Sequence, residues 1–192
     1  MRNVDKSLKA GDANYTQRVE MMIAAAQDMP PSSNVAVAVI DEPSFVGKST
    51  KITNWFAQRD LDVRLTFVLG TDTITRFFEQ RYYPSNDSMM ASIQHFFMPK
   101  DRGGEDSRII CARRHSDAST DDIEAFLDGA DVREYVRTGK IHLLDISPEE
   151  AMMSSTAVRN GVSASGLESI SWGRTCTPSV GLYIQDHKLY IT

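Results

Sequence analysis

Apolar and polar residues alternate along this chain in two recurring patterns. Continuous apolar runs predict strands, and they fall at residues 35–40, 65–69, 108–112 and 141–146. Apolar residues three or four positions apart predict helices, at residues 16–27, 51–59, 73–80, 121–127 and 179–187. Because helices and strands alternate, we expect the α/β class, with a parallel sheet covered by helices on both faces.

Two stretches qualify this picture. The run at residues 35–40 is rich in β-branched residues, which is typical of a strand buried on both faces. Residues 84–106 contain prolines, glycines and many polar residues, and they predict a mobile excursion with one short helix. No internal repeat or long linker is present, so we expect residues 1–192 to form a single domain.

Composition narrows the range of partners and compartments. The 192 residues carry a net charge of -5, so nucleic acid and anionic membranes are not expected partners. The longest apolar run, at residues 35–40, is too short to span a bilayer, and the polar N-terminus does not resemble a signal peptide. Two cysteines and four scattered histidines form no disulfide framework and no metal-binding spacing. We therefore expect a cytoplasmic or nuclear protein without a resident metal.

Residues 154–159 carry the clearest candidate chemistry. Ser154, Ser155 and Thr156 open an expected helix, and Arg159 follows Ser155 by one turn on the same face. A helix start offers free N–H groups and the positive end of the helix dipole, which suit a phosphate. The guanidinium adds a bidentate partner for an anion. An ordinary Ser/Thr cap with a solvated arginine is the alternative interpretation.

Three weaker candidates lie earlier in the chain. Residues 47–50 read Gly-Lys-Ser-Thr, the end of a P-loop, but Glu42 stands where the first glycine belongs, so a solvated lysine is the favoured interpretation. Gly70 and Asp72 follow a strand and could approach a ribose, or could form a simple turn. Tyr82 and Tyr83 could stack on a heteroaromatic ring, although core packing is favoured.

Taken together, these segments resemble the nicotinamide (or nicotinate) mononucleotide adenylyltransferases of the nucleotidyltransferase superfamily. Residues 153–159 resemble the family's ISSTxxR motif, with Met153 in place of isoleucine, and residues 68–72 resemble its strand ending in G-x-D. Residues 183–190 are similar to the Y-I-x-x-H-x-L-Y ending of eukaryotic members. Residues 18–25 are similar to the family's R-x-x-M-x-x-x-A helix, and residues 109–113 are similar to its apolar strand that ends in arginine. Residues 3–6 and 41–45 are similar to a divergent fungal branch of the family.

The resemblance implies a Rossmann-like, doubly wound sheet and transfer of AMP from ATP to the mononucleotide, giving NAD and pyrophosphate, with Mg²⁺ accompanying ATP. ATP and a pyridine mononucleotide would be the partners, and homo-oligomer formation is left open. The implied roles, in chain order, are a mononucleotide pocket at Asp41 and Glu42, nucleotide contact at Gly70 and Asp72, ring stacking by Tyr83 with Tyr82 as the alternate, and ATP-phosphate binding by Ser154, Ser155, Thr156 and Arg159. Arg159 would also act in catalysis by neutralising polyphosphate charge, and Arg113 would assist.

One departure from the family matters for both fold and activity. The family opens with a strand carrying G-x-F-x-P-x-H-x-G-H, which these 192 residues lack. In the family's strand order, 3-2-1-4-5-6, the absent strands would lie between those corresponding to residues 35–40 and 65–69. We expect either that the remaining strands re-pair or, the favoured interpretation, that the chain is an N-terminally incomplete gene product with weak or no activity. The alternatives are a catalytically impaired nucleotide-binding paralogue or weak ATPase with a regulatory role, and a P-loop NTPase.

Overall fold

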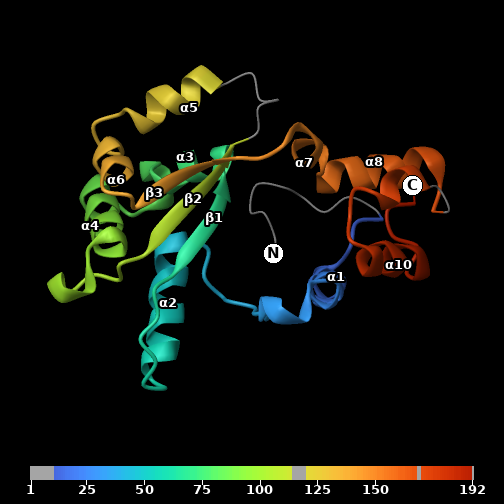
Figure 1. Ribbon diagram of the computed structural model, residues 1–192, viewed down its shortest axis with the longest axis horizontal. Coiled ribbons are helices and arrows are strands. Elements are labelled where there is room, and N and C mark those ends of the chain that lie inside the picture. The colour runs from blue at the N-terminus through green and yellow to red at the C-terminus, as the bar shows by residue number, and fades with distance from the viewer. Residues whose placement is uncertain (1–10, 114–119, 168–169, 192) are drawn as a thin grey trace. The chain divides into compact units, whose positions relative to one another are not determined.

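The computed structural model describes residues 11–113, 120–167 and 170–191, and it divides the chain into two compact units (Figure 1). The first unit comprises Met1–Val39 and Met152–Thr192, and the second comprises Ile40–Ala151. Each unit has its own hydrophobic core and is described by itself. The expected single domain over residues 1–192 stays a prediction. Among the described residues, no helix has the length and apolar character that crossing a membrane requires.

The second unit is built on a three-stranded parallel sheet. Its strands are β1 (Thr66–Gly70), β2 (Arg108–Arg113) and β3 (Ile141–Asp145), hydrogen-bonded in the order β1-β2-β3. In this register Gly70 lies opposite Ala112, and Arg113 lies opposite Asp145, so the strands end together at one edge. Three predicted strands and the α/β class are thereby confirmed.

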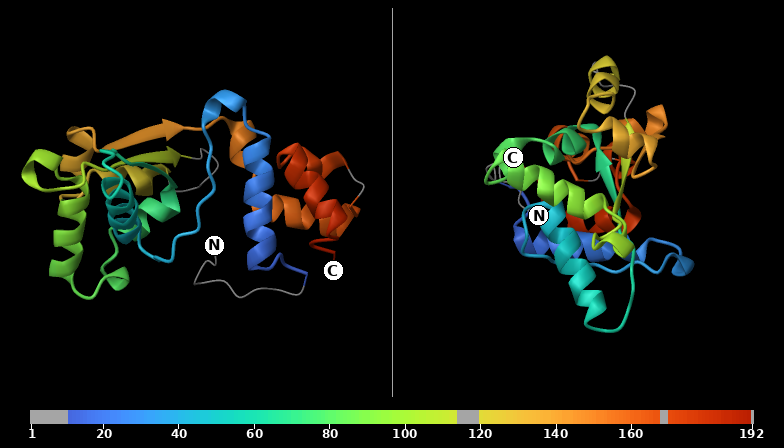
Figure 2. Two further views of the ribbon diagram at one scale, coloured as in Figure 1. Left: turned by 90° about the horizontal axis from the view of Figure 1, so that it is seen from below. Right: turned by 90° about the vertical axis from the view of Figure 1, so that its left-hand side faces the viewer.

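Helices connect the strands and cover one face of the sheet. The helices of this unit are α2 (Phe45–Ala57), α3 (Thr71–Phe77), α4 (Asn86–Phe97), α5 (Thr120–Leu127), α6 (Arg133–Arg137) and α7 (Pro148–Met152). Side chains of β1, β2 and β3 that point to the covered face, such as Leu69, Ile109 and Ile141, are buried with Phe77 of α3 and Phe96 of α4. Helices α2 and α4 lie side by side beneath the sheet (Figure 2).

The other face of the sheet is open. Val68, one residue out of phase with Leu69 along β1, is 67% exposed, and Leu144 of β3 is 50% exposed. Successive side chains of a strand point to opposite faces, so these apolar residues mark the uncovered side. Coverage of both faces, which a doubly wound sheet requires, is therefore not established by this unit.

The predicted strand at residues 35–40 was wrong. The segment is not assigned to a strand, and Val35 and Val39 are 51% and 60% exposed. Strand propensity mainly reflects how a side chain packs against neighbouring strands. None of the described strands pairs with this segment, so its β-branched residues have no ladder to join.

The prediction for residues 84–106, a mobile excursion with one short helix, was right about the helix but underestimated its length and burial. This segment contains the twelve-residue helix α4, which begins after Ser85, whose hydroxyl accepts a hydrogen bond from the Ser88 N–H at 3.1 Å. Four of its residues are buried: Met89, Ile93, Phe96 and Phe97. Their spacing is helical, and the prolines and glycines that suggested a loop lie outside the helix.

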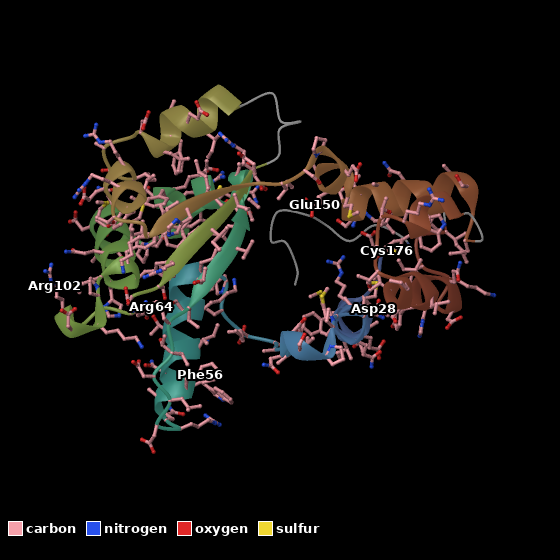
Figure 3. All side chains as sticks on the ribbon, viewed as in Figure 1. Asp28, Phe56, Arg64, Arg102, Glu150 and Cys176 are labelled. Atoms are coloured by element: carbon pink, nitrogen blue, oxygen red, sulfur yellow. The ribbon has the colours of Figure 1, made fainter. Side chains whose placement is uncertain are left out.

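The first unit is helical. It contains α1 (Tyr15–Gln27), α8 (Ser155–Ser165), α9 (Ile170–Gly173) and α10 (Pro178–Asp186). Helix α1 begins one residue earlier than predicted and is capped by Asn14, and Asn14 and Gln17 form a reciprocal capping box. At the other end of α1, the carboxylate of Asp28 (Figure 3) accepts hydrogen bonds from the N–H and hydroxyl of Ser179, at 2.9 and 2.6 Å. These bonds join α1 to the start of α10.

Candidate nucleotide-binding site

The start of α8 has the form that the sequence predicts. Ser154 occupies the cap position, and its hydroxyl accepts a hydrogen bond from the Ala157 N–H at 3.0 Å. Val158 is buried in the core of the first unit, which fixes how the helix is turned about its axis. Ser155 and Thr156 are exposed, while Ser154 is half-buried and held by its capping role. The pair of hydroxyls left facing outward is therefore Ser155 and Thr156.

Arg159 lies one turn beyond these hydroxyls. Its Nη2 donates to the Thr156 hydroxyl at 3.3 Å, so the guanidinium leans towards the helix start. Backbone N–H groups in the first turn of a helix have no partner within the helix. The guanidinium, the two hydroxyls and these N–H groups form a compact set of hydrogen-bond donors, which is the arrangement that a phosphate group binds.

Gly70 and Asp72 lie at the carboxyl edge of the sheet in the second unit. Gly70 is both the last residue of β1 and the cap of α3, and Asp72 is exposed in the first turn of that helix. An added Cβ at Gly70 would lie 3.2 Å from Oδ1 of Asp72, so the carboxylate folds back over the glycine. A carboxylate accepts hydrogen bonds from hydroxyl groups, and contact of Asp72 with a ribose hydroxyl stays a prediction.

The two tyrosines differ sharply in environment. The Tyr83 ring packs against the core of the second unit, and its hydroxyl donates to the Phe77 carbonyl at 2.7 Å. Burial raises the pKa of Tyr83 to about 12. Tyr82 is 42% exposed, with the Arg81 guanidinium 4.9 Å from its ring centroid. Of the pair, Tyr82 is therefore the side chain presented to solvent, whereas Tyr83 holds η2 (Gln80–Tyr82) against the core.

Glu42 serves the start of α2. Its Oε1 accepts hydrogen bonds from the N–H and the hydroxyl of Ser44, at 3.0 and 2.8 Å. The Ser44 hydroxyl, followed by the Ser44 N–H, holds the pKa of Glu42 below its ordinary value. Asp41 is exposed, and its backbone carbonyl accepts a hydrogen bond from the Lys51 ammonium. A mononucleotide contact by Asp41 or Glu42 stays a prediction.

The same contacts bear on the P-loop alternative. An added Cβ at Gly47 would lie 2.4 Å from the Glu42 carboxyl carbon, so the Glu42 side chain packs directly against this glycine. Lys48 is 8% exposed, and its ammonium donates to the Pro43 carbonyl at 2.9 Å and lies 4.6 Å from the Phe45 ring centroid. With no strand leading into this segment, the described structure disfavours a P-loop.

Arg113 is held by two carboxylates that sequence reasoning did not select. It forms a bidentate pair with Asp145, Nε–Oδ1 2.6 Å and Nη2–Oδ2 3.1 Å, and Nη1 lies 3.0 Å from Glu124 Oε1. The Asp145 hydrogen bonds are the main reason that the pKa of Arg113 is raised further. The signal for Asp145 was available, since it ends the strand beside β2 at the same edge.

The predicted site residues are divided between the two units. The second unit contains six of them (Asp41, Glu42, Gly70, Asp72, Tyr82 and Tyr83), and the first unit contains Ser154, Ser155, Thr156 and Arg159. Their convergence on one ligand stays a prediction. In the part of the chain that the structure describes, no three acidic, histidine or cysteine side chains are grouped to hold a metal ion. The chain matches no family model, no curated protein and no solved structure.

Proposed function

We propose that this chain binds ATP through the start of α8 and transfers its adenylyl group to a nicotinamide or nicotinate mononucleotide. The observation that carries the proposal is the donor set formed by Ser155, Thr156 and Arg159 at a capped helix start. We infer the type of reaction, adenylyl transfer, from the sequence resemblance to mononucleotide adenylyltransferases. We place the protein in the cytoplasm or the nucleus.

The sheet supports a Rossmann-like assignment as part of the same proposal. Its parallel order β1-β2-β3 would correspond to strands 4-5-6 of the 3-2-1-4-5-6 arrangement. The exposed side chains of Val68 and Leu144 mark a face that a doubly wound sheet covers.

The reaction requires positioning and charge stabilisation rather than a protein nucleophile. A mononucleotide phosphate oxygen attacks the α-phosphorus of ATP, the bond from that phosphorus to the bridging oxygen breaks, and pyrophosphate leaves. Mg²⁺ would arrive with ATP and offset charge on the leaving group. Arg159 would neutralise the polyphosphate, Gly70 would allow close approach of the nucleotide, and Tyr82 would present a ring for stacking on the pyridine.

A second function is favoured by one observation, the absence of G-x-F-x-P-x-H-x-G-H from these 192 residues. A nucleotide-binding protein without transfer activity, or with weak ATP hydrolysis, would keep the α8 site and lack the catalytic histidines of the family. Both functions require ATP at α8, and they differ only in the product that is formed.

The test measures binding and product formation on the same samples. The folded chain is incubated with ATP, Mg²⁺ and each mononucleotide, and the dinucleotide and pyrophosphate are quantified beside calorimetric ATP binding. Dinucleotide formation that Arg159→Ala abolishes supports transfer, whereas Arg159-dependent ATP binding without dinucleotide supports the second function. The matched control is Arg174→Ala, which removes one exposed arginine from the same unit. Failure of the folded chain to bind ATP would reject both functions.

A further inference from the structure

The sheet of the second unit has two outer edges, one formed by β1 and the other by β3 (Figure 1). Along a strand, the backbone N–H and C=O groups of successive residues point alternately to the two sides. The Arg108 N–H donates to the Leu65 carbonyl at 2.9 Å, so the backbone of Leu65 faces β2. Thr66 and Val68 therefore direct their N–H and C=O groups away from β2, towards the outer edge.

The outward groups of β1 have no hydrogen-bond partner among the described residues. Thr66 is exposed and Val68 is 67% exposed, so solvent reaches this edge. An edge strand is a template for a further strand, and natural proteins usually protect it with a charged residue, a proline or a bulge. Residues 66–70 read Thr-Phe-Val-Leu-Gly and carry no charge and no proline. The edge at β1 therefore lacks the usual protection against pairing.

The edge at β3 is different. The Ile109 N–H donates to the Lys140 carbonyl at 2.9 Å, so by the same alternation the backbone of Leu143 faces outward. This strand, however, contains the exposed side chain of His142 and ends at the carboxylate of Asp145. Polar and charged side chains at an edge disfavour pairing, because an incoming strand removes water from them. Of the two edges, β1 is the one suited to a further strand.

We propose that two copies of this chain associate through β1, with the two strands antiparallel and related by a two-fold axis at Phe67. Thr66 of each copy then exchanges both of its backbone hydrogen bonds with Val68 of the other copy. A two-fold contact is self-complementary, so one edge supplies the donors and the acceptors for both copies. The exposed side chain of Val68 lies beside Thr66 of the second copy, and the two sheets become continuous.

This association uses only residues of the second unit, so it does not depend on ATP binding at α8. Few residues take part, and the contact is therefore smaller than a standard protein–protein interface, which buries about 1,600 Å². We expect a weak dimer with a dissociation constant of about 10–100 µM.

Sedimentation equilibrium of the full chain between about 1 and 300 µM covers this range. We expect monomer at the lowest concentration and mainly dimer at the highest. Amide hydrogen exchange measured by NMR at both concentrations locates the contact. The Val68 N–H should exchange about threefold more slowly at the high concentration, because it is hydrogen-bonded only in the dimer. The Leu143 N–H, which faces outward on β3, is the internal control and should not change. A chain that is monomeric throughout would overturn the proposal.

Two substitutions at Val68 test the edge itself. Val68→Pro removes an N–H that the pairing with β2 does not use, and an edge strand tolerates proline at such a position. Val68→Lys keeps the backbone and adds the charge that protects natural edges. Each should weaken dimerisation at least about tenfold, and if Val68→Pro fails to fold, Val68→Lys decides the outcome.

Leu144→Lys is the matched control, because it places the same charge on the same uncovered face but on β3. Its dissociation constant should stay within about twofold of that of the unmodified chain. Dimerisation that persists in Val68→Lys, or that Leu144→Lys abolishes, would refute pairing through β1.

Discussion

The strongest test of the site assignment compares Lys48 with Arg159. A P-loop protein would need Lys48 for ATP, whereas the proposed site needs Arg159. In the structure Lys48 is almost fully buried, and its ammonium donates to the Pro43 carbonyl and lies over the Phe45 ring, so we expect it to stabilise the second unit. Replacing Lys48 by methionine keeps the volume of the side chain and removes only its charge and its donors.

The magnitude follows from the lost contacts. A hydrogen bond from a charged group contributes about 1.5–3 kcal/mol, and an ammonium over a ring contributes about 0.5–2 kcal/mol. Burial opposes these terms, since it lowers the pKa of Lys48 and disfavours the charged form that methionine removes. We therefore expect Lys48→Met to lower the free energy of unfolding by about 1–2 kcal/mol, and to leave the ATP dissociation constant unchanged.

Arg159→Ala should show the opposite behaviour. Its one hydrogen bond to a protein side chain in the described structure, to Thr156, is long and solvent-accessible, so its loss should change the free energy of unfolding by less than about 1 kcal/mol. A guanidinium–phosphate contact contributes about 1.5–3 kcal/mol, so ATP affinity should fall by about 10- to 100-fold.

Urea unfolding and titration calorimetry measure the two effects separately. The chain has two tryptophans, with Trp55 in the same helix as Lys48 and Trp172 buried in the first unit. Fluorescence of a Trp172→Phe background therefore reports on the unit that Lys48 stabilises. Loss of ATP binding in a stable Lys48→Met protein would refute the site assignment, as would unchanged ATP affinity in Arg159→Ala.

Three further predictions concern the second unit. Phe96→Ala should lower the free energy of unfolding by about 3–5 kcal/mol, because Phe96 is fully buried among aromatic rings; a loss below about 1 kcal/mol in urea unfolding would contradict the assigned core. Asp106→Asn should cost about 3 kcal/mol by leaving the Lys140 ammonium buried without its carboxylate. Burial raises the pKa of Asp106, but the hydrogen bonds and charges of Lys140 and Arg64 outweigh burial and lower the pKa overall. The stabilisation by the Asp106 carboxylate is therefore present above pH 3.8 and lost at lower pH. If Asp106→Asn left the dependence of the melting temperature on acid pH unchanged, this role of Asp106 would be refuted. Folding raises the pKa of Tyr83, so the stabilisation that its protonated hydroxyl provides falls as the pH rises from about 10 to 12. In Tyr83→Phe the melting temperature should therefore depend less on pH over that range.

The pattern of apolar residues correctly predicted the strands that pair with another strand of this chain. The strands at 65–69, 108–112 and 141–146 were predicted within a residue or two, because each lies beside another strand of the same sequence. The run at residues 35–40 has equal strand propensity and remains unpaired. Propensity describes one segment, whereas a strand requires a partner, and a single run cannot reveal whether that partner exists.

Helix α4 shows the converse error. Its apolar residues Met89, Ile93 and Phe96 have clear helical spacing, but prolines and glycines on either side suggested an irregular segment. Those residues mark the ends of the helix and do not interrupt it. The same oversight hid Glu105, which is buried three residues before β2, because a loop that is expected to be mobile is not expected to bury a carboxylate. Local spacing should therefore outweigh the composition of the flanking turns.

Arg113 and Arg159 differ in how many protein groups already pair with their guanidinium groups, and this difference bears on the proposed phosphate binding. Arg113 stands at the carboxyl edge of the sheet, where nucleotides bind in doubly wound folds, and it would be the natural choice for phosphate binding. Its guanidinium is already paired with Asp145 and Glu124, so an arriving phosphate would have to displace two carboxylates. Arg159 makes one weak hydrogen bond to Thr156, beside exposed hydroxyls at a helix start. We therefore expect Arg159 to bind an anion at lower cost than Arg113, and the proposed ATP recognition to depend on the start of α8.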